Sequence, residues 1–214
     1  MKQKIIVIDD FYDQPNEIRR FALSLPFHKK KGATYPGVEA IVDWDFSEVR
    51  QEMADFIHED ISGSCPKPMP FAQGKFRLAL ADDEETRVDN VHIDIQPWSG
   101  VVYLSLPKDC SGHSAVSFYR HRATGEIEDS EIWREYISAE LGFNDQLPKE
   151  ERTRRFWEYM RDKSCWDEIE RIENRFNRVL LLYARVFHGS VGIFGSEPSN
   201  GRLTQHFEFY YPSS

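Results

Sequence analysis

The stretch Val91-His92-Ile93-Asp94 decides how the rest of the chain is interpreted. Residues two apart on an extended strand project from the same face, so His92 and Asp94 are predicted to point into one cavity. An imidazole and a carboxylate can supply two ligands to a divalent metal. His188, which follows a strongly apolar run, is the candidate third ligand. Two histidines and one carboxylate leave coordination positions open, and this donor set suits non-haem Fe(II).

A less specific interpretation stands beside this one. The pattern H-x-D occurs by chance, and most isolated histidines are structural or surface residues. A different set of histidines, His113, His121 and His206, has a spacing that predicts no shared face. The metal hypothesis therefore depends on the rest of the chain.

Length, charge and cysteine content limit the classes of protein that fit. The 214 residues, 40% of them hydrophobic, suit a single domain over residues 1–214. Charges of both signs are interspersed at a net charge of −9, so no nucleic-acid partner is expected, and the basic run 28–31 is interpreted as a solvated loop. No apolar span is long enough for a membrane helix, and three separated cysteines predict neither a disulfide framework nor a zinc site. We expect a cytoplasmic protein, and the sequence leaves open whether it forms a homodimer.

The first third of the chain predicts two strands and two helices. Residues 4–8 are β-branched, and residues 75–81 alternate well enough for a strand. Between them, apolar residues at helical spacing predict a helix that starts near Pro15 and a second helix over about 46–59.

The middle of the chain predicts a β region with a helical insertion. After a turn at 96–100, strands are predicted over 101–106 and 112–119, which indicates an antiparallel meander or barrel. Residues from about 128 to 175 predict helices that form either a lid over a pocket or an outer layer, and the β pattern returns at 176–183. The sequence thus predicts an α+β fold with a mainly β core. Five aromatic residues could line a pocket, although most aromatic residues belong to cores: Trp98, Phe118, Tyr119, Trp133 and Trp157.

The last predicted strand, 201–211, has two contrasting faces. Leu203, Phe207 and Phe209 share one face, and the other carries Arg202, Thr204, His206 and Glu208. Such a polar face marks either an exposed edge strand or the lining of a wet cavity. A guanidinium that faces into a barrel suits a carboxylate ligand.

In this order, the elements resemble the Fe(II)/2-oxoglutarate-dependent dioxygenases, and most closely their prolyl-hydroxylase-like branch. The match covers about residues 75–118 and 176–211. It consists of H-x-D at 92–94, a Y-L-S strand from Tyr103, a glycine turn before Phe118, an N-R-V-L-L-L strand from Asn177, the distal His188 and a G-R-L-T strand from Gly201. The resemblance implies a double-stranded β-helix, the jelly-roll or cupin-like fold.

The resemblance also implies a cofactor and a reaction. His92, Asp94 and His188 would bind Fe(II), with 2-oxoglutarate and O2 as co-substrates. The implied reaction couples the oxidative decarboxylation of 2-oxoglutarate to succinate with hydroxylation of an unactivated C–H bond. Halogenating members lack the carboxylate, so Asp94 favours hydroxylation or a related oxidation.

Four further residues are carried over from the family. Arg202 would hold the distal carboxylate of 2-oxoglutarate, helped by Tyr103. Thr204 would add a hydroxyl donor, and His206 would lie near the iron or the co-substrate in a role that the resemblance does not assign.

The substrate is the least constrained part of the hypothesis. A free amino acid or other small molecule is our first choice. A peptide or protein side chain is the second, because the prolyl-hydroxylase-like branch contains such enzymes. Two rivals remain. One is a non-oxidative metal-binding barrel that performs hydrolysis or isomerisation with zinc, and the other is a barrel that senses a small acid. Metal content and 2-oxoglutarate turnover distinguish them.

Overall fold

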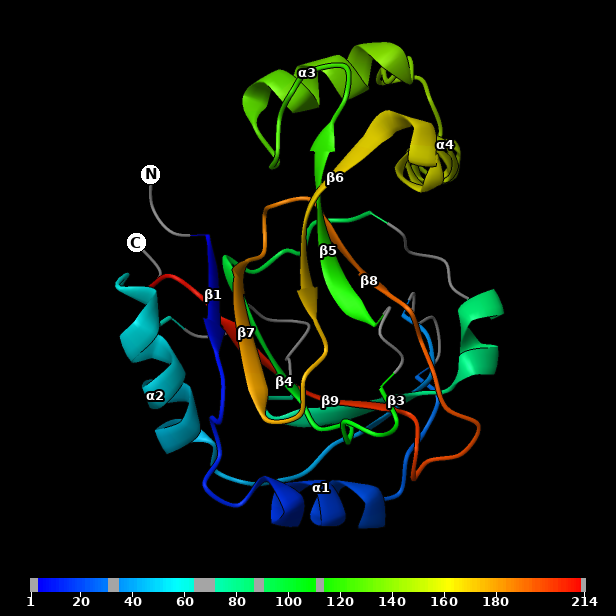
Figure 1. The fold of residues 1–214 in the computed structure, drawn as a ribbon. Helices are drawn as coiled ribbons and strands as arrows, with labels where there is room; N and C mark the ends of the chain where they lie inside the picture. Colours follow the sequence, from blue (N-terminus) through cyan, green and yellow to red (C-terminus); the bar gives the residue numbers. More distant parts are fainter. Residues whose placement is uncertain (1–3, 31–34, 64–71, 87–90, 111–113, 213–214) are drawn as a thin grey trace.

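Two antiparallel sheets form the centre of the computed structural model, which describes residues 4–30, 35–63, 72–86, 91–110 and 114–212 (Figure 1). The larger sheet has the strand order β1-β7-β4-β9-β3-β2 and the smaller β6-β5-β8. The larger sheet comprises β1 (Ile5–Ile8), β2 (Val38–Ala40), β3 (Lys75–Ala79), β4 (Trp98–Tyr103), β7 (Arg178–Tyr183) and β9 (Arg202–Phe209). The smaller comprises β5 (Ala115–His121), β6 (Trp166–Glu173) and β8 (His188–Val191). The predicted mainly β architecture with added helices is confirmed at this level.

The outer face of the larger sheet is covered by the two N-terminal helices, α1 (Pro15–Ser24) and α2 (Ser47–Ile57). Alternate residues of the strands, such as Leu78, Leu181 and Phe207, pack against Ala22 of α1 and Met53 of α2. Because side chains alternate across a strand, this packing turns the remaining set inward. The predicted helices and the strand at 4–8 are confirmed.

The inner face of the larger sheet packs against the smaller sheet. Val101 and Leu180 of the larger sheet form one apolar cluster with Val116 and Phe118 of the smaller. The polar residues of β9 lie on this inner face. Since β9 pairs with β4 on one side and β3 on the other, it is not an edge strand. The exposed-edge interpretation is therefore wrong, and Arg202, His206 and Glu208 of this face line a cavity.

The predicted helical insertion at 128–175 is correct only in its first part. Its helices are α3 (Glu131–Glu140) and α4 (Lys149–Arg161), which Figure 1 shows at the opposite end of the molecule from α1. Residues 166–173 instead form β6, paired with β5. As an edge strand, β6 leaves most of its charged side chains exposed, so it lacks the apolar alternation that signals a strand. Short 3-10 helices follow β3 (Ala81–Thr86) and precede β6 (Lys163–Cys165).

Three local predictions are also wrong. Strand β4 runs from Trp98 to Tyr103, so it includes most of the predicted turn at 96–100 and ends before residue 106. Pairing with β7 and β9 on both sides overrides the turn signal of Gly100. Residues 92–94 form no strand, since His92 takes part only in an isolated bridge with His188. In addition, β2 was not predicted.

Within the described residues, no helix combines the length and apolar character needed to cross a membrane. Cys110 and Cys165 are free thiols, and Cys65 lies outside the described residues, as does the glycine turn at 112–113.

Candidate metal centre

Backbone hydrogen bonds bring the H-x-D segment beside the start of β8. The His92 N–H donates to the carbonyl of His188 at 2.8 Å, and the His188 N–H donates back to the carbonyl of His92 at 3.0 Å. The Asp94 N–H donates to the carbonyl of Ala184 at 2.8 Å, and Arg185 Nη1 donates to the Asp94 carbonyl at 3.2 Å. Two segments far apart in the sequence are thus held in one register. The side chains of His92 and Asp94 point to the same side, as predicted, although residues 92–94 do not form a regular strand.

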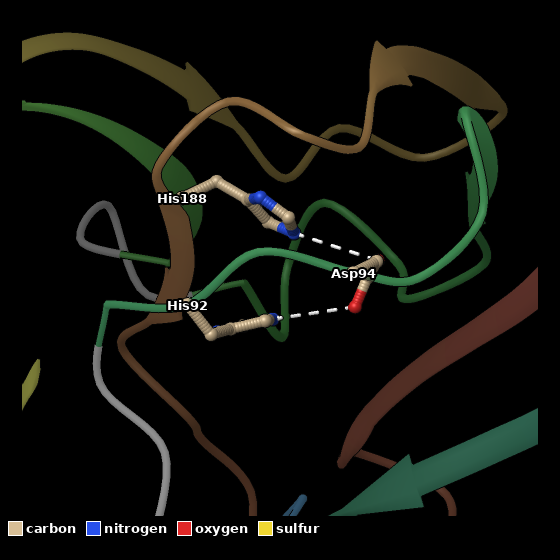
Figure 2. A group of neighbouring side chains, drawn as sticks. All are labelled: His92, Asp94 and His188. Atoms are coloured by element: carbon tan, nitrogen blue, oxygen red, sulfur yellow. Dashed lines mark ion pairs between the residues drawn. The ribbon is translucent and has the colours of Figure 1, made fainter. Parts of the chain in front are cut away.

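Figure 2 shows both imidazoles pointing toward the Asp94 carboxylate. His92 Nε2 lies 3.9 Å from Asp94 Oδ1, and His188 Nε2 lies 3.7 Å from Asp94 Oδ2. One ligand atom from each residue falls within 4.8 Å of the others. These separations exceed a hydrogen bond and leave room for a shared ion with ligand bonds of about 2.0–2.2 Å. Two imidazole nitrogens and one carboxylate oxygen fit the donor set that binds Fe(II).

His188 is oriented by its own backbone. Its Nδ1 lies 2.8 Å from the carbonyl oxygen of Val186. Because a carbonyl only accepts, Nδ1 carries the proton and Nε2 presents a lone pair toward the cluster. This is the tautomer that a metal ligand requires.

Asp94 is oriented by two neighbours that the sequence did not indicate. Gln96 Nε2 donates to Asp94 Oδ2 at 3.0 Å, and Ser99 Oγ donates to the same oxygen at 3.2 Å. Gln96 and Ser99 are themselves linked at 2.6 Å. Burial raises the pKa of the Asp94 carboxyl, but the neighbouring His188, His92 and Arg77 lower it more, so the net pKa falls below its usual range. The carboxylate is therefore ionised and positioned to act as a ligand.

The cluster opens into a cavity of about 130 Å³ between the two sheets. Its walls include Val101, Val116 and Leu182, which are apolar, and Arg202, whose side chain enters from the first position of β9. Arg202 is 8% exposed. A buried guanidinium that lines the same cavity as the three potential metal ligands suits a small ligand with a carboxylate.

The other three residues that the resemblance implies for cofactor binding differ in whether they reach the cavity. His206 lines the cavity, and its Nε2 is 2.9 Å from the Thr204 hydroxyl. Burial and the charges of Arg77, Lys75 and Arg202 hold the pKa of His206 well below its usual value, so it is neutral.

Tyr103 and Thr204 are cross-strand partners, both fully buried, and neither belongs to the cavity wall among the described residues. The Tyr103 hydroxyl is buried near the guanidinium of Arg202. Burial raises the pKa of Tyr103 to about 12, although the charge of Arg202 acts to lower it.

Two charged residues of the cavity wall were not predicted as functional, Arg77 on β3 and Glu208 on β9. Both alternate with buried apolar residues on strands that cover a core. That alternation placed Glu208 on a polar face, and it is the signal by which Arg77 could also have been found.

The two described members of the competing histidine set, His121 and His206, lie in different parts of the structure. His121 is buried, with Nε2 2.7 Å from the Tyr159 hydroxyl and Nδ1 2.8 Å from the Thr124 hydroxyl. His206 lies in the cavity, and His113 lies outside the described residues. Across the described ranges, His92, Asp94 and His188 are the one cluster of three potential ligands.

The five aromatic residues considered as pocket lining do not contribute to the described wall of this cavity. Trp98, Phe118 and Trp133 belong to the three apolar clusters of the core. Tyr119 and Trp157 pack at the edge of the cluster beneath α3 and α4.

Comparisons with known proteins place the chain in a family without an assigned activity. A sequence model of the family described as "Family of unknown function (DUF6445)" matches residues 1–209. No curated protein matches the sequence.

Two solved structures are similar to the chain at low sequence identity. One is the selenomethionine-labelled Fe(II)/(alpha)ketoglutarate-dependent dioxygenase TqaL, with 10% identity, a TM-score of 0.47, and coverage of 99% of this chain and 84% of that chain. The other is the non-heme iron oxygenase OrfP in complex with Fe, with 10% identity, a TM-score of 0.36, and coverage of 94% of this chain and 78% of that chain. At these values, neither similarity bears on the reaction of the present protein.

Proposed function

The chain belongs to DUF6445, a family of unknown function, and we propose that it is an Fe(II)- and 2-oxoglutarate-dependent oxygenase that hydroxylates a small molecule. One observation carries the proposal. The cluster of His92, Asp94 and His188 shares a cavity with the buried guanidinium of Arg202. A metal site with open positions and a carboxylate-binding group are the two parts that the reaction needs.

The metal would be held by His92 Nε2, His188 Nε2 and the Asp94 carboxylate. When bound, Fe(II) supplies the oxygen-activating redox chemistry. The chain keeps the Nε2 lone pair of His188 directed inward through the Val186 carbonyl. Gln96 and Ser99 hold the Asp94 carboxylate in place.

The co-substrate would be held on the inner face of β9. Arg202 binds the distal carboxylate of 2-oxoglutarate, and the apolar wall formed by Val101, Val116 and Leu182 limits water around it. Tyr103 and Thr204 lie on the same face of the sheet, so their hydroxyls are proposed to orient the guanidinium and the carboxylate. His206 stays neutral beside them and adds no charge that competes with the metal.

The finer fold assignment belongs to the same proposal. Two facing antiparallel sheets with the metal cluster between them support a double-stranded β-helix. The prolyl-hydroxylase-like branch rests on the sequence resemblance alone.

The decisive experiment is an anaerobic titration of the Fe(II)-loaded protein with 2-oxoglutarate, followed by admission of air. We expect a visible absorption band that depends on both components, and succinate after oxygen is added. Asp94→Ala should lose both signals because it removes one ligand. Arg202→Ala should keep iron and weaken 2-oxoglutarate binding by about 30-fold or more.

The control is Asp167→Ala, which alters an aspartate exposed on β6, and it should behave like the wild type. Iron binding without a 2-oxoglutarate-dependent band and without succinate would contradict the proposal. In that case a zinc-dependent activity or the binding of another small acid would explain the cluster.

A further inference from the structure

The cavity carries one positive and one negative side chain that the metal centre and Arg202 do not account for. Arg77 lies on β3 as the register partner of Thr204, and Glu208 lies four positions further along β9. Even spacing along a strand keeps the side chain on one face, so both project inward. Both line the cavity that contains His92, Asp94 and His188.

Arg77 lies against an aromatic ring. Its guanidinium carbon lies 3.8 Å from the centroid of the Tyr35 ring. The Tyr35 hydroxyl donates to Glu39 at 2.5 Å, and Glu39 pairs with Lys75 at 3.1 Å. This chain of contacts fixes the stacked ring and therefore the plane of the guanidinium.

The hydrogen-bonding capacity of Arg77 is left for another molecule. Its Nε is buried without a hydrogen-bond partner among the described residues. Glu39, its register partner on β2, is already occupied by Tyr35 and Lys75. A planar guanidinium stacked on one side and lining a cavity binds a carboxylate through two parallel N–H bonds.

Glu208 offers the complementary charge. The Tyr210 hydroxyl donates to Oε2 of Glu208, whose side chain lines the cavity. No ion pair joins Glu208 to Arg77. Burial raises the pKa of the Glu208 carboxyl, whereas the hydrogen bond from Tyr210 and the charges of Lys75 and Arg77 lower it. Two opposite charges that line one cavity are matched by a ligand that carries both signs.

We propose that Arg77 binds the carboxylate and Glu208 the ammonium group of a free amino acid, which is the prime substrate of the enzyme. The role of the amino acid as a substrate rests on the proposed function. Its binding can be measured without turnover. An amino-acid residue inside a peptide has neither charge on its backbone, so the pair selects the free zwitterion. The side chain then lies in the cavity that also contains the metal ligands.

The test is isothermal calorimetry on the full chain with Mn(II) and 2-oxoglutarate, using the standard L-amino acids one at a time. The best binder is then compared with the amine that lacks its carboxylate, the acid that lacks its amino group, and its N-acetyl amide. We expect the free amino acid to bind most tightly and the N-acetyl amide, which resembles a peptide, to bind least.

The variants separate the two charges. Arg77→Gln should lower the affinity for the free amino acid by about 30-fold or more, and it should leave the affinity for the amine analogue within about twofold of the wild type. Glu208→Gln should have the reverse selectivity, weakening the amino acid and sparing the acid analogue. Arg50→Gln is a matched control, because Arg50 lies 5.5 Å from the Phe209 ring outside this cavity. Tyr35→Leu keeps Arg77 but removes the stacked ring, and we expect a loss of about fivefold.

Several outcomes would overturn the inference. The inference fails if no amino acid binds the wild type, or if the N-acetyl amide binds best. It also fails if Arg77→Gln weakens the binding of the amine analogue as much as the binding of the free amino acid. A loss of 2-oxoglutarate affinity in Arg77→Gln as large as in Arg202→Ala would instead assign Arg77 to the co-substrate. If Arg77→Gln does not fold, Arg77→Lys and Tyr35→Leu carry the same comparison. Amino-acid binding without a 2-oxoglutarate-dependent absorption band would retain this inference and reject the proposed oxygenase.

Discussion

At the level of single residues, Gln96 shows how a candidate metal ligand is held in its orientation. It is buried, and its amide reaches both the Asp94 carboxylate and the Ser99 hydroxyl. Groups that orient a metal ligand in this way commonly increase the affinity for the metal, because the carboxylate no longer has to be arranged when the ion binds.

Replacing Gln96 with leucine keeps the volume and removes both hydrogen bonds. We expect the dissociation constant for the metal to rise about 10- to 100-fold, because the carboxylate is no longer fixed. Competition against a chromogenic chelator measures it. Gln51→Leu is the matched control, since Gln51 makes a similar bond to Asp55 at 2.8 Å on the exposed face of α2. Equal affinities in the two variants would show that Gln96 does not orient Asp94.

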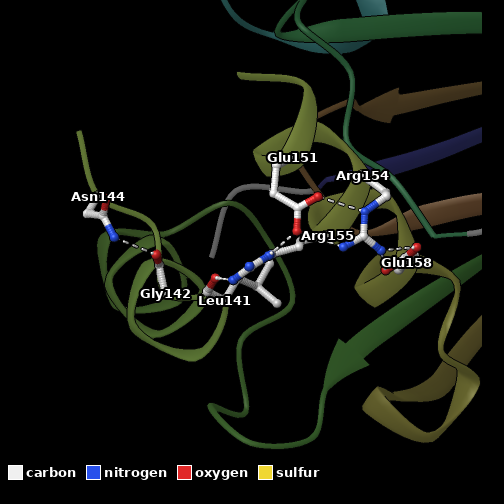
Figure 3. A network of polar contacts seen from close by, with 7 residues as sticks. All are labelled: Leu141, Gly142, Asn144, Glu151, Arg154, Arg155 and Glu158. Atoms are coloured by element: carbon white, nitrogen blue, oxygen red, sulfur yellow. Dashed lines mark hydrogen bonds and ion pairs between the residues drawn. The ribbon is translucent and has the colours of Figure 1, made fainter. Parts of the chain in front are cut away.

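At the scale of elements, polar contacts tie together segments that the sequence separates. Figure 3 shows Arg155 of α4 reaching the end of α3, where its Nη1 donates to the Leu141 carbonyl at 3.0 Å. On the same helix, Glu151 and Glu158 flank Arg154 in ion pairs of 2.7 Å. These surface pairs stabilise α4 itself, whereas the Arg155 contact sets how the two helices of the insertion meet.

The end of β1 is joined to the start of β7 by Asp9. Arg178 contacts its two carboxylate oxygens at 2.7 Å and 3.0 Å, and Arg175 adds a contact of 3.0 Å. The hydrogen bond with Arg178 holds the pKa of Asp9 below its usual range, although burial acts in the opposite direction. A lowered carboxyl pKa stabilises the fold above the unfolded-state pKa, and the contribution is lost as the pH falls through the folded-state value.

Asp9→Asn should therefore lower the free energy of unfolding at pH 7 by about 1 kcal/mol. The difference from the wild type should shrink as the pH drops below about 4, the usual carboxyl range. Urea denaturation across this pH range measures it. Asp167→Asn, which breaks the exposed pair with Arg122, should change stability by less than about 0.5 kcal/mol. A pH-independent deficit in Asp9→Asn would assign the effect to packing instead.

At the scale of the whole molecule, the metal cluster joins two distant parts of the chain across the edge of the sheets. His188 starts β8, whereas His92 and Asp94 lie in the segment that precedes β4. Phe187, next to His188, packs against Trp133 of α3 and Trp166 of β6, each at 4.9 Å between ring centroids. The site is thus connected with the helical segment as well as with the sheets.

Because a bound ion links these parts only in the folded state, it should stabilise the fold. Mn(II) at about 100 times its dissociation constant should raise the free energy of unfolding by about 2.7 kcal/mol, and a chelator should reverse the gain. His188→Ala should abolish the response. His28→Ala, which removes an exposed histidine, should preserve it. Thermal denaturation with and without metal is the measurement, and an unchanged response in His188→Ala would exclude this cluster as the binding site.

Short-range patterns in the sequence were enough to predict the elements whose local period is strong and the residues whose chemistry is unusual. The alternation of Leu203, Phe207 and Phe209 predicted β9, and the spacing of His92 and Asp94 predicted two ligands on one side. The strand prediction succeeds because the two-residue period is a property of a short segment, whereas His92 and Asp94 point to one side outside any regular strand.

Which polar faces line the cavity depends on contacts between strands that are far apart in the sequence. On sequence, Arg77 and Glu208 look like residues of any exposed strand face, and β6 looks like part of a charged helix. Their roles depend on pairing between distant strands, which a single segment does not encode. The same pairing makes β9 a central strand, and the bridge between His92 and His188 closes the metal cluster.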